Sequence, residues 1–377
     1  MKIALVHDDL IQFGGAERVF LTLAQAFPEA DLFTSMATKD WEQRIEEHLG
    51  KQGLRTSFMQ KLPAKKRLYR AYFFLFPLAF ESFDFSEYDL VISSSTRYAH
   101  GVITKPGTLH VCYMNSPGRM FWQPCQYFSE NPLVGRLLTP FLSWLRMWDY
   151  TAAQRVEHFV GNSKLVQKRI SRFYNRDAEV IYPYVDLERF SLPGDEEKLA
   201  SEEPVKDFPE DYYLIVSRLV AWKKIDLAVQ ACNNLKLPLV VVGDGPDKQR
   251  LRDLAGPTVQ VVGRLSDQSV VKSYQAAKGF IFPQEEDFGI TPLEAMASGK
   301  PVLAYRAGGA LETILPGETG AFFSPQTVEG LQQALEKFEP EQFDPVACRR
   351  RAERFGKQRF IEEIQDLVAR FWKHQNE

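Results

Sequence analysis

The sequence has 377 residues, of which 45% are hydrophobic and 25% charged, and its formal net charge is -3. That length is too great for one ordinary hydrophobic core and predicts two domains. The slightly acidic pI of about 6.2 excludes a general nucleic-acid binder, which needs a basic excess on one face. The four cysteines are widely spaced and form no C-x-x-C pair, so neither a zinc site nor a disulfide framework is expected.

The first residues, MKIALVHDD, reach the polar run His7 to Asp9 before the apolar core of a signal peptide is complete, and they predict a buried strand. The longest apolar stretch, Ala71 to Phe80, is half of the ~20 residues that a membrane-spanning helix needs and contains Pro77. We therefore expect no spanning helix, and since the cysteines indicate no disulfide framework, we expect a cytoplasmic protein.

Apolar, β-branched runs alternate with helical patterns along the chain, which is typical of parallel sheets with crossover helices. The predicted strands are KIALVHD, DLVISSS, LHVCYMN, HFVGNS and AEVIYP, then YYLIVSR, PLVVVGDG, VQVVGR, GFIFP and PVLAY. The polar segment Ser191 to Glu210 between the two sets predicts a linker. Two doubly wound α/β domains follow, with ligands expected in a cleft at the carboxyl ends of the strands.

The motif FGGAERV follows the first predicted strand and opens a helix. Gly14 and Gly15 permit close backbone approach, and the amides of the helix N-terminus suit a phosphate or a sugar hydroxyl. A plain strand-to-helix turn that needs positive φ is an equally good interpretation of this motif alone. The motif lacks the G-x-G-x-x-G spacing, so a nicotinamide cofactor is not indicated.

The motif SRLVAWKK places Arg218 and Lys223 where the first strand of the second domain ends. Two fixed cations there suit the charge that develops on a departing diphosphate. The alternative is a pair of surface cations in salt bridges.

In the motif EEDFGITPLEAMASGKPV, seven residues separate Glu286 from Glu294, and Glu285 is a rival to the first. Gly289 allows a tight turn, and a helix is predicted to start near Thr291 with free amides at its N-terminus. The surrounding residues are apolar, and buried carboxylates need partners. Sugar and ribose hydroxyls would be such partners.

These motifs, together with VVGDGPD, VGRLSD and GGALETILPGETG, resemble family 4 of the retaining glycosyltransferases, which have the GT-B fold. The resemblance runs from the first strand nearly to the C-terminus and is strongest from Tyr212 to Phe323. The segments WDYTAAQRVEHFVGNSKLVQKRI and VIYPYVDLERF are most similar to bacterial mannosyltransferases of surface polysaccharide synthesis.

The resemblance implies that Arg218 and Lys223 hold the donor diphosphate. It implies that Glu286 lies near the donor sugar and Glu294 near the ribose, and that Arg264 lies where such enzymes seat the base. The donor is then a nucleoside-diphosphate sugar, with GDP-mannose expected, although the sequence leaves GDP, UDP and ADP open.

Backbone amides of Phe288, Gly289 and Ile290 would meet the sugar and phosphate, while Gly14 and Gly15 would line the cleft from the first domain. The resemblance divides the chain into an acceptor-side domain, 1–190, and a nucleotide-sugar domain, 191–356. The last segment, 357–377, resembles the family's final helix, which crosses back onto the first domain.

One position departs from the family. Many relatives have a His where this chain has Asn115, close to the reacting sugar. Asn hydrogen-bonds a hydroxyl but does not titrate, so it is neither an acid nor a base. His100 and His110 lie nearby in sequence, and we expect both to be structural.

The resemblance predicts transfer of a hexose with retention to a glycan or lipid-linked acceptor, with no metal and no cofactor. Two alternatives stay open: a non-catalytic subunit that binds sugar nucleotides, and a sugar-nucleotide epimerase of similar build. The segment Lys61 to Phe80 places five cations, Lys61, Lys65, Lys66, Arg67 and Arg70, before an aromatic run. It predicts peripheral contact with an anionic membrane, the alternative being a basic helix with an aromatic core face.

Overall fold

The computed structural model describes residues 1–50, 53–69, 71–128, 132–193 and 208–376. The chain forms two compact units, unit 1 being Met1–Pro183 with Gln358–Glu377 and unit 2 being Tyr184–Lys357. The predicted linker at 191–210 lies mainly outside the described residues.

Unit 1 contains a sheet of seven strands in the order β3-β2-β1-β4-β5-β6-β7, and every pair is parallel. The strands are β1 Ile3–His7, β2 Asp31–Thr34, β3 Leu54–Thr56, β4 Leu90–Ser95, β5 Leu109–Met114, β6 His158–Gly161 and β7 Ala178–Val180. Its helices are α1 Gly15–Ala26, α2 Lys39–Leu49, α3 Lys65–Leu68, α4 Phe76–Glu81, α5 Arg119–Trp122, α6 Pro124–Tyr127, α7 Pro132–Leu137, α8 Thr139–Ala153, α9 Lys164–Tyr174 and α17 Lys357–Asn376. Two short 3-10 turns are η1 Phe58–Lys61 and η2 Ala99–Gly101.

Unit 2 contains a sheet of six parallel strands in the order β10-β9-β8-β11-β12-β13. The strands are β8 Tyr213–Val216, β9 Leu239–Val242, β10 Val259–Gly263, β11 Gly279–Phe282, β12 Val302–Tyr305 and β13 Gly320–Phe323. Its helices are α10 Ile225–Leu235, α11 Lys248–Leu254, α12 Asp267–Ala276, α13 Thr291–Ala297, α14 Ala310–Thr313, α15 Val328–Leu335 and α16 Pro345–Glu353, with 3-10 turns η4 Ala221–Lys223 and η5 Pro340–Gln342.

All ten predicted strands are present, and in β1, β4 and β5 every residue is buried. Burial on both faces is why these strands are continuous apolar or small-residue runs rather than alternating patterns. The sequence analysis missed β2, β3 and β13. These strands are short, and β3 and β13 are only partly buried, so their sequences LRT and GAFF lack a strong strand pattern.

Each sheet has a point where the strand order reverses: between β1 and β4 in unit 1, and between β8 and β11 in unit 2. In open parallel sheets the loops that leave adjacent strands at such a point diverge and form a crevice for ligands. The predicted doubly wound α/β fold is therefore confirmed, and the segments after these four strands are where a site should lie.

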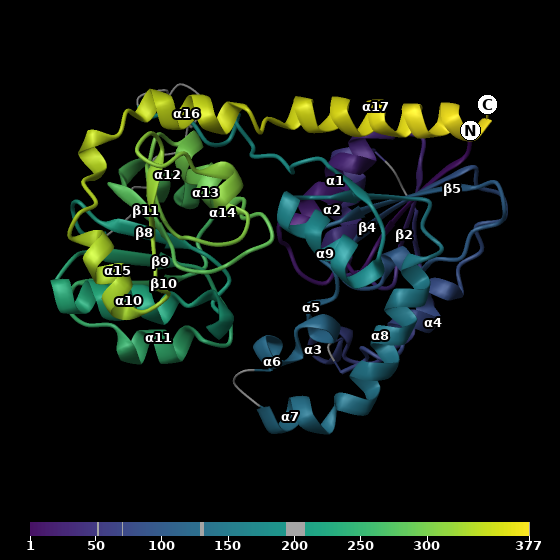
Figure 1. Cartoon of the computed structure of the whole chain (residues 1–377), viewed down its shortest axis with the longest axis horizontal. Helices are drawn as coiled ribbons and strands as arrows, with labels where there is room; N and C mark the ends of the chain where they lie inside the picture. The colour runs from purple at the N-terminus through teal and green to yellow at the C-terminus, as the bar shows by residue number, and fades with distance from the viewer. Residues whose placement is uncertain (51–52, 70, 129–131, 194–207, 377) are drawn as a thin grey trace. The chain divides into compact units, whose positions relative to one another are not determined.

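Helix α17 packs on unit 1, as predicted (Figure 1). The ring of Phe360 meets Tyr113 of β5 edge-on at 5.6 Å, and the ring of Phe371 stacks on His158 at 3.6 Å. The amide of Gln365 donates to the carbonyl of Ala26 at the end of α1, at 2.7 Å. Residues 191 to 339 positions apart are thus joined in one unit.

Asp8 connects the two strands at the reversal point of unit 1. It directly follows β1, and its Oδ1 accepts hydrogen bonds from the backbone amides of Tyr98 and Ala99, both at 2.7 Å. Its Oδ2 accepts from the amides of Thr96 and Arg97, at 2.5 and 3.0 Å, and from the Thr96 hydroxyl. Burial opposes ionisation of Asp8, but the charge of Arg97 and these hydrogen bonds prevail and lower its pKa.

We expect Asp8→Ala to lower the free energy of unfolding by about 3 kcal/mol, because it leaves buried amides without an acceptor. Asp8→Asn should cost less, since one acceptor oxygen remains. Urea denaturation followed by circular dichroism measures both. Equal stability of wild type and Asp8→Ala would contradict the structural role.

The same interaction predicts a pH dependence. The pKa of Asp8 is lower in the folded chain than in the unfolded one, so its contribution is complete above the ordinary carboxyl pKa of about 3.9 and is lost as the pH falls through the lower folded value. The stability difference between wild type and Asp8→Asn should be constant near neutral pH and shrink below about pH 4. A difference that grows on acidification would be contrary to this assignment.

Candidate functional site

In unit 2 the loop after β8 is held by two glycines of the VVGDGPD motif. Gly243 and Gly245 have φ of 145° and 159°. A Cβ on Gly243 would lie 1.8 Å from the carbonyl oxygen of Ser217, and one on Gly245 would lie 2.1 Å from that of Leu219. The backbones therefore pack directly against each other, and this fixes the segment from which the exposed Arg218 projects.

Lys223 and Glu286 come together across the reversal point. Lys223 ends η4, after β8, and its buried ammonium forms an ion pair with the carboxylate of Glu286, after β11. The ammonium also lies 4.4 Å from the ring centroid of Trp222. The amide of Gln284 donates to the same carboxylate at 3.0 Å. The structure thus joins two residues that the sequence analysis selected separately.

The loop that contains Glu286 is packed against the segment after β12. The amide of Gly309 donates to the carbonyl of Glu286 at 2.9 Å. A Cβ on Gly309 would lie 2.3 Å from the Cα of Phe288, which is buried. Gly289 has φ of 85°, and a Cβ there would lie 2.9 Å from the ring of Phe282. A side chain at Gly289 or at Gly309 would collide with these neighbours, so both positions need glycine.

Glu294 lies in the first turn of α13, which starts at Thr291 as predicted. It is buried, and its Oε2 accepts a hydrogen bond from the hydroxyl of Tyr274 at 2.9 Å. Ile290 is the residue before the helix. The exposed Arg264 follows β10, which β9 separates from β8. All these residues lie at one edge of the sheet, while their contacts with a donor stay predictions.

In unit 1 an ion pair lies at the corresponding point. Asp9 directly follows Asp8, is buried, and contacts the guanidinium of Arg97 at 2.5 Å. Burial raises the pKa of Asp9, and the positive charge of Arg97 offsets this only in part. The side chain of Arg97 is 27% exposed. Arg97 was not among the predicted site residues, because its place two residues after the strand DLVISSS does not show that it pairs with Asp9.

Asn115 lies next to this ion pair along the sheet edge. It follows β5, is buried, and its Nδ2 donates to the hydroxyl of Ser94 in β4 at 3.1 Å. Its backbone carbonyl accepts a hydrogen bond from the side-chain amide of Asn162, which follows β6, at 2.9 Å. Asn115 therefore connects the ends of three adjacent strands.

Gly14 and Gly15 begin α1 at the same edge. Gly14 has extended backbone, with φ of -142°, and caps the helix, while Gly15 is its first residue. Neither glycine has positive φ, so the turn interpretation of this motif is wrong in that detail. A Cβ on Gly14 would meet only the far end of the Glu17 side chain, at 2.9 Å from its carboxylate, and that flexible side chain can shift.

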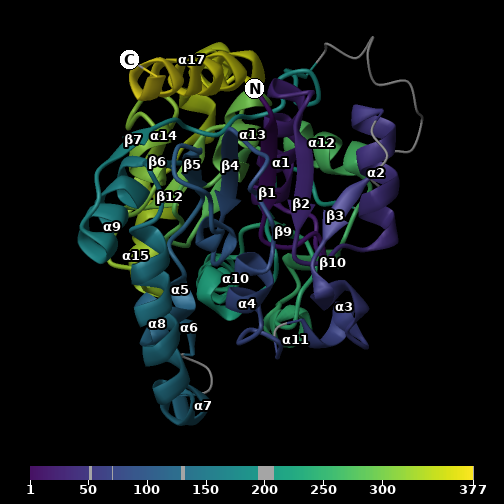
Figure 2. The same ribbon diagram turned by 90° about the vertical axis from the view of Figure 1, so that its right-hand side faces the viewer.

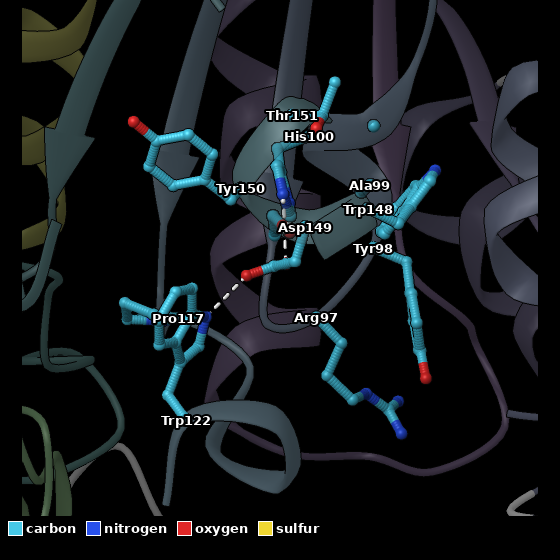
Figure 3. A network of polar contacts seen from close by, with 12 residues as sticks. Arg97, Tyr98, Ala99, His100, Pro117, Trp122, Trp148, Asp149, Tyr150 and Thr151 are labelled. Carbon is cyan, nitrogen blue, oxygen red and sulfur yellow. Dashed lines mark hydrogen bonds and ion pairs between the residues drawn. The ribbon is translucent and has the colours of Figure 1, made fainter. Parts of the chain in front are cut away.

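Both nearby histidines are enclosed in unit 1. Figure 3 shows the ring of His100 beside Asp149. The Nε2 of His100 lies 3.2 Å from Oδ1 of Asp149, and Oδ2 of Asp149 accepts a hydrogen bond from the indole of Trp122 at 2.7 Å. His110 contacts the hydroxyl of Ser93 at 2.8 Å, and burial lowers its pKa to about 3. His110 is therefore neutral at ordinary pH.

The segment Lys61 to Phe80 divides into η1, α3 and α4 rather than forming one helix. Phe76 and Phe80 are buried in the core, and the ring of Phe76 stacks on Tyr98 at 4.7 Å. Phe74 and Leu78 are exposed. Arg70 lies outside the described residues. The core interpretation thus holds for part of this segment, and no helix within the described ranges is long and apolar enough to cross a membrane.

Two family descriptions match the chain: "Glycosyltransferase Family 4" over residues 13–189 and "Glycosyl transferases group 1" over residues 197–359. The GDP-mannose-dependent alpha-mannosyltransferase of Mycolicibacterium smegmatis is 38% identical over 122 residues, which are 32% of this chain and 31% of that protein. The O-antigen chain mannosyltransferase C of Escherichia coli is 26% identical over 187 residues, 47% of this chain and 48% of that protein. The chain thus spans about half or less of the length of the curated relatives it matches.

Among solved structures, the sucrose-phosphate synthase of Thermosynechococcus elongatus has a TM-score of 0.74 at 17% identity. The match covers 99% of this chain and 100% of the synthase chain. Anabaena HepE, in complex with UDP, has a TM-score of 0.71 at 20% identity, and the match covers 98% of this chain and 100% of the HepE chain. The similarity in fold extends over both units. The chain therefore belongs to the family 4 glycosyltransferases and has the GT-B fold.

Proposed function

We propose that the protein is a retaining glycosyltransferase that moves mannose from GDP-mannose to a glycan or lipid-linked acceptor. The observation that supports it most is the pair Lys223 and Glu286, joined at the reversal point of unit 2 beside the exposed Arg218. The names of the mannosyltransferases from M. smegmatis and E. coli support mannose, and the first of them supports GDP.

In this proposal Arg218 and Lys223 stabilise the diphosphate as it departs. The bond between the anomeric carbon and the diphosphate oxygen breaks, and the acceptor hydroxyl bonds to that carbon from the same face. The hydroxyl proton passes to a phosphate oxygen, so no titrating side chain is needed and Asn115 suffices as a hydrogen-bonding group. The enzyme contributes fixed charges and backbone amides, including those of Phe288 to Ile290, rather than a nucleophile.

Unit 1 is proposed to bind the acceptor at the edge where β1 and β4 end. The side chain of Arg97 is held by Asp9 and is 27% exposed, so it offers fixed hydrogen-bond donors to hydroxyl or phosphate oxygens. Gly14 and Asn115 lie at the same edge. We also propose that the protein is cytoplasmic and makes peripheral contact with the inner face of the cytoplasmic membrane. The exposed residues of the segment Lys61 to Phe80 would contribute to this contact.

A non-catalytic subunit is the alternative that Asn115 favours, because the family His is missing there. An epimerase would consume the donor without an acceptor. Turnover that requires both substrates distinguishes the proposed enzyme from both alternatives.

We expect Arg218→Ala and Lys223→Ala each to lower the transfer rate at saturating donor by about 10²–10³-fold, as for the loss of one preorganised charged donor. Lys337→Ala, which removes an exposed lysine just after α15, is the matched control and should be neutral. Turnover of folded variants is the measurement. Wild-type rates in both site variants would remove the support for this site.

The two glutamates should separate donor binding from transfer. Glu294→Gln should weaken the binding of the bare nucleoside diphosphate, because its proposed partner is the ribose. Glu286→Gln should leave that affinity nearly unchanged and reduce transfer. Tyr274→Phe, which removes the hydrogen bond to Glu294, should resemble a mild Glu294→Gln. Calorimetry with the nucleotide decides, and equal losses of affinity for both glutamate variants would show that the roles are wrongly divided.

A further inference from the structure

Large apolar side chains crowd one stretch of unit 1, from residue 133 to residue 150. Leu137 is 79% exposed and Met147 is 64% exposed. The other exposed apolar side chains of this stretch are Leu133, Val134, Phe141, Trp144 and Tyr150. Soluble proteins usually expose such side chains singly, and a contiguous group indicates an interaction surface.

Helix α8 is apolar on both of its sides. Leu142 and Leu145 are buried on the inner side. At about 100° per residue, Trp144 and Met147 lie on the outer side, where a surface helix ordinarily has polar residues. The helix has 15 residues, too few to span a bilayer but enough to lie in its interface. We refer to the exposed apolar side chains of α7 and α8 as the outer face.

The charge of this stretch favours a lipid surface over a second copy of the chain as the partner of the outer face. From Leu133 to Trp148 the sequence contains no acidic residue. Arg136 is exposed, whereas the guanidinium of Arg146 turns inward and donates to the carbonyl of Phe121. A second copy of the chain would bring a second Arg136 to the interface, whereas an anionic lipid surface would neutralise this cation. Trp144 and Tyr150 are residue types that favour the boundary between lipid and water.

The inner side of α8 is fixed to the edge of the sheet where the proposed acceptor site lies. Asp149 is fully buried and contacts both His100, which follows β4, and Trp122, which ends α5 (Figure 3). The indole of Trp148 donates to Glu81 at 2.8 Å. Figures 1 and 2 both show α8 running from this region to α7, at the end of unit 1 away from α17. The outer face is thus presented by a helix with buried polar anchors.

We propose that the outer face of α7 and α8 seats on an anionic lipid surface and so brings lipid-borne acceptors to the sheet edge that contains Arg97 and Asn115. This inference rests on the proposed function, which includes a peripheral membrane contact, and adds which face makes that contact; the vesicle measurements below do not depend on sugar transfer.

Vesicle sedimentation tests the contact, with phosphatidylcholine vesicles that contain phosphatidylglycerol compared with phosphatidylcholine alone. The face variant combines Leu137→Gln, Trp144→Gln and Met147→Gln. Its matched control combines Ile103→Gln, Leu311→Gln and Val346→Gln, which change three exposed apolar residues outside α7, α8 and the segment Lys61 to Phe80. We expect the face variant to lose affinity for the anionic vesicles by on the order of tenfold or more, and the control to keep most of it. Equal binding by the face variant and wild type, or loss only in the control, would overturn the inference.

A second measurement is independent of folding defects. Brominated acyl chains quench tryptophan fluorescence at short range, so wild type should be quenched more strongly than Trp144→Phe, which alters one of the six tryptophans. Equal quenching would contradict insertion of the outer face. Light scattering adds a further check: a wild-type dimer that the face variant converts to a monomer, with no vesicle binding by either, would assign the face to a second copy.

Turnover with a water-soluble acceptor separates this inference from the proposed function. The face variant should keep that turnover, because its changes lie on the outer side of α7 and α8. A protein that binds anionic vesicles through this face but transfers no sugar would support the lipid contact and contradict the proposed function. A protein that transfers sugar but ignores the vesicles would overturn the lipid contact alone.

Discussion

In both units the strands are parallel, so all of them end at one edge of the sheet, and the loops that leave two adjacent strands at a reversal point come together there. This constraint places the functional candidates. Residues 63 positions apart, Lys223 and Glu286, form an ion pair because β8 and β11 are neighbours. Asp9 and Arg97 pair for the same reason, since β1 and β4 are neighbours.

The carboxylates near the two reversal points are stabilised by other protein groups rather than by water. A buried carboxylate without a partner is costly. The buried Asp8, Asp9 and Glu294 are bonded to backbone amides, Arg97 and Tyr274 respectively. The partly buried Glu286 is paired with Lys223. Such pairs are preorganised, so a ligand with phosphates or hydroxyls meets groups that are already in place. The glycines around the loops serve the same end, because Gly243, Gly245 and Gly309 allow backbones to approach where any Cβ would collide.

Much of the fold followed from local pattern. Strands such as β1 and β4 were predictable because burial on both faces demands continuous runs of apolar or small residues, whereas β13, with the sequence GAFF, gave little signal. The residues of the unit 2 loops could be selected from sequence because the family motifs are specific, and their roles toward a donor stay predictions. Arg97 could not be selected, because its significance depends on Asp9, 88 positions away.

The prediction of a membrane-facing segment shows the same limit. The basic and aromatic composition of Lys61 to Phe80 indicated an interface, yet Phe76 and Phe80 pack into the core. A larger group of exposed apolar side chains lies on α7 and α8, whose sequence is apolar on both sides and does not by itself show which side is covered. Only the tertiary contacts of Asp149, Leu142 and Leu145 identify the inner side.

The anomeric configuration of the product tests the central claim most directly. Purified protein would be supplied with GDP-mannose and a mannose-containing acceptor, and the new linkage would be assigned by nuclear magnetic resonance. We predict a product that forms only when the acceptor is present and that keeps the α configuration of the donor. A β-linked product, or donor consumption that does not depend on the acceptor, would contradict it.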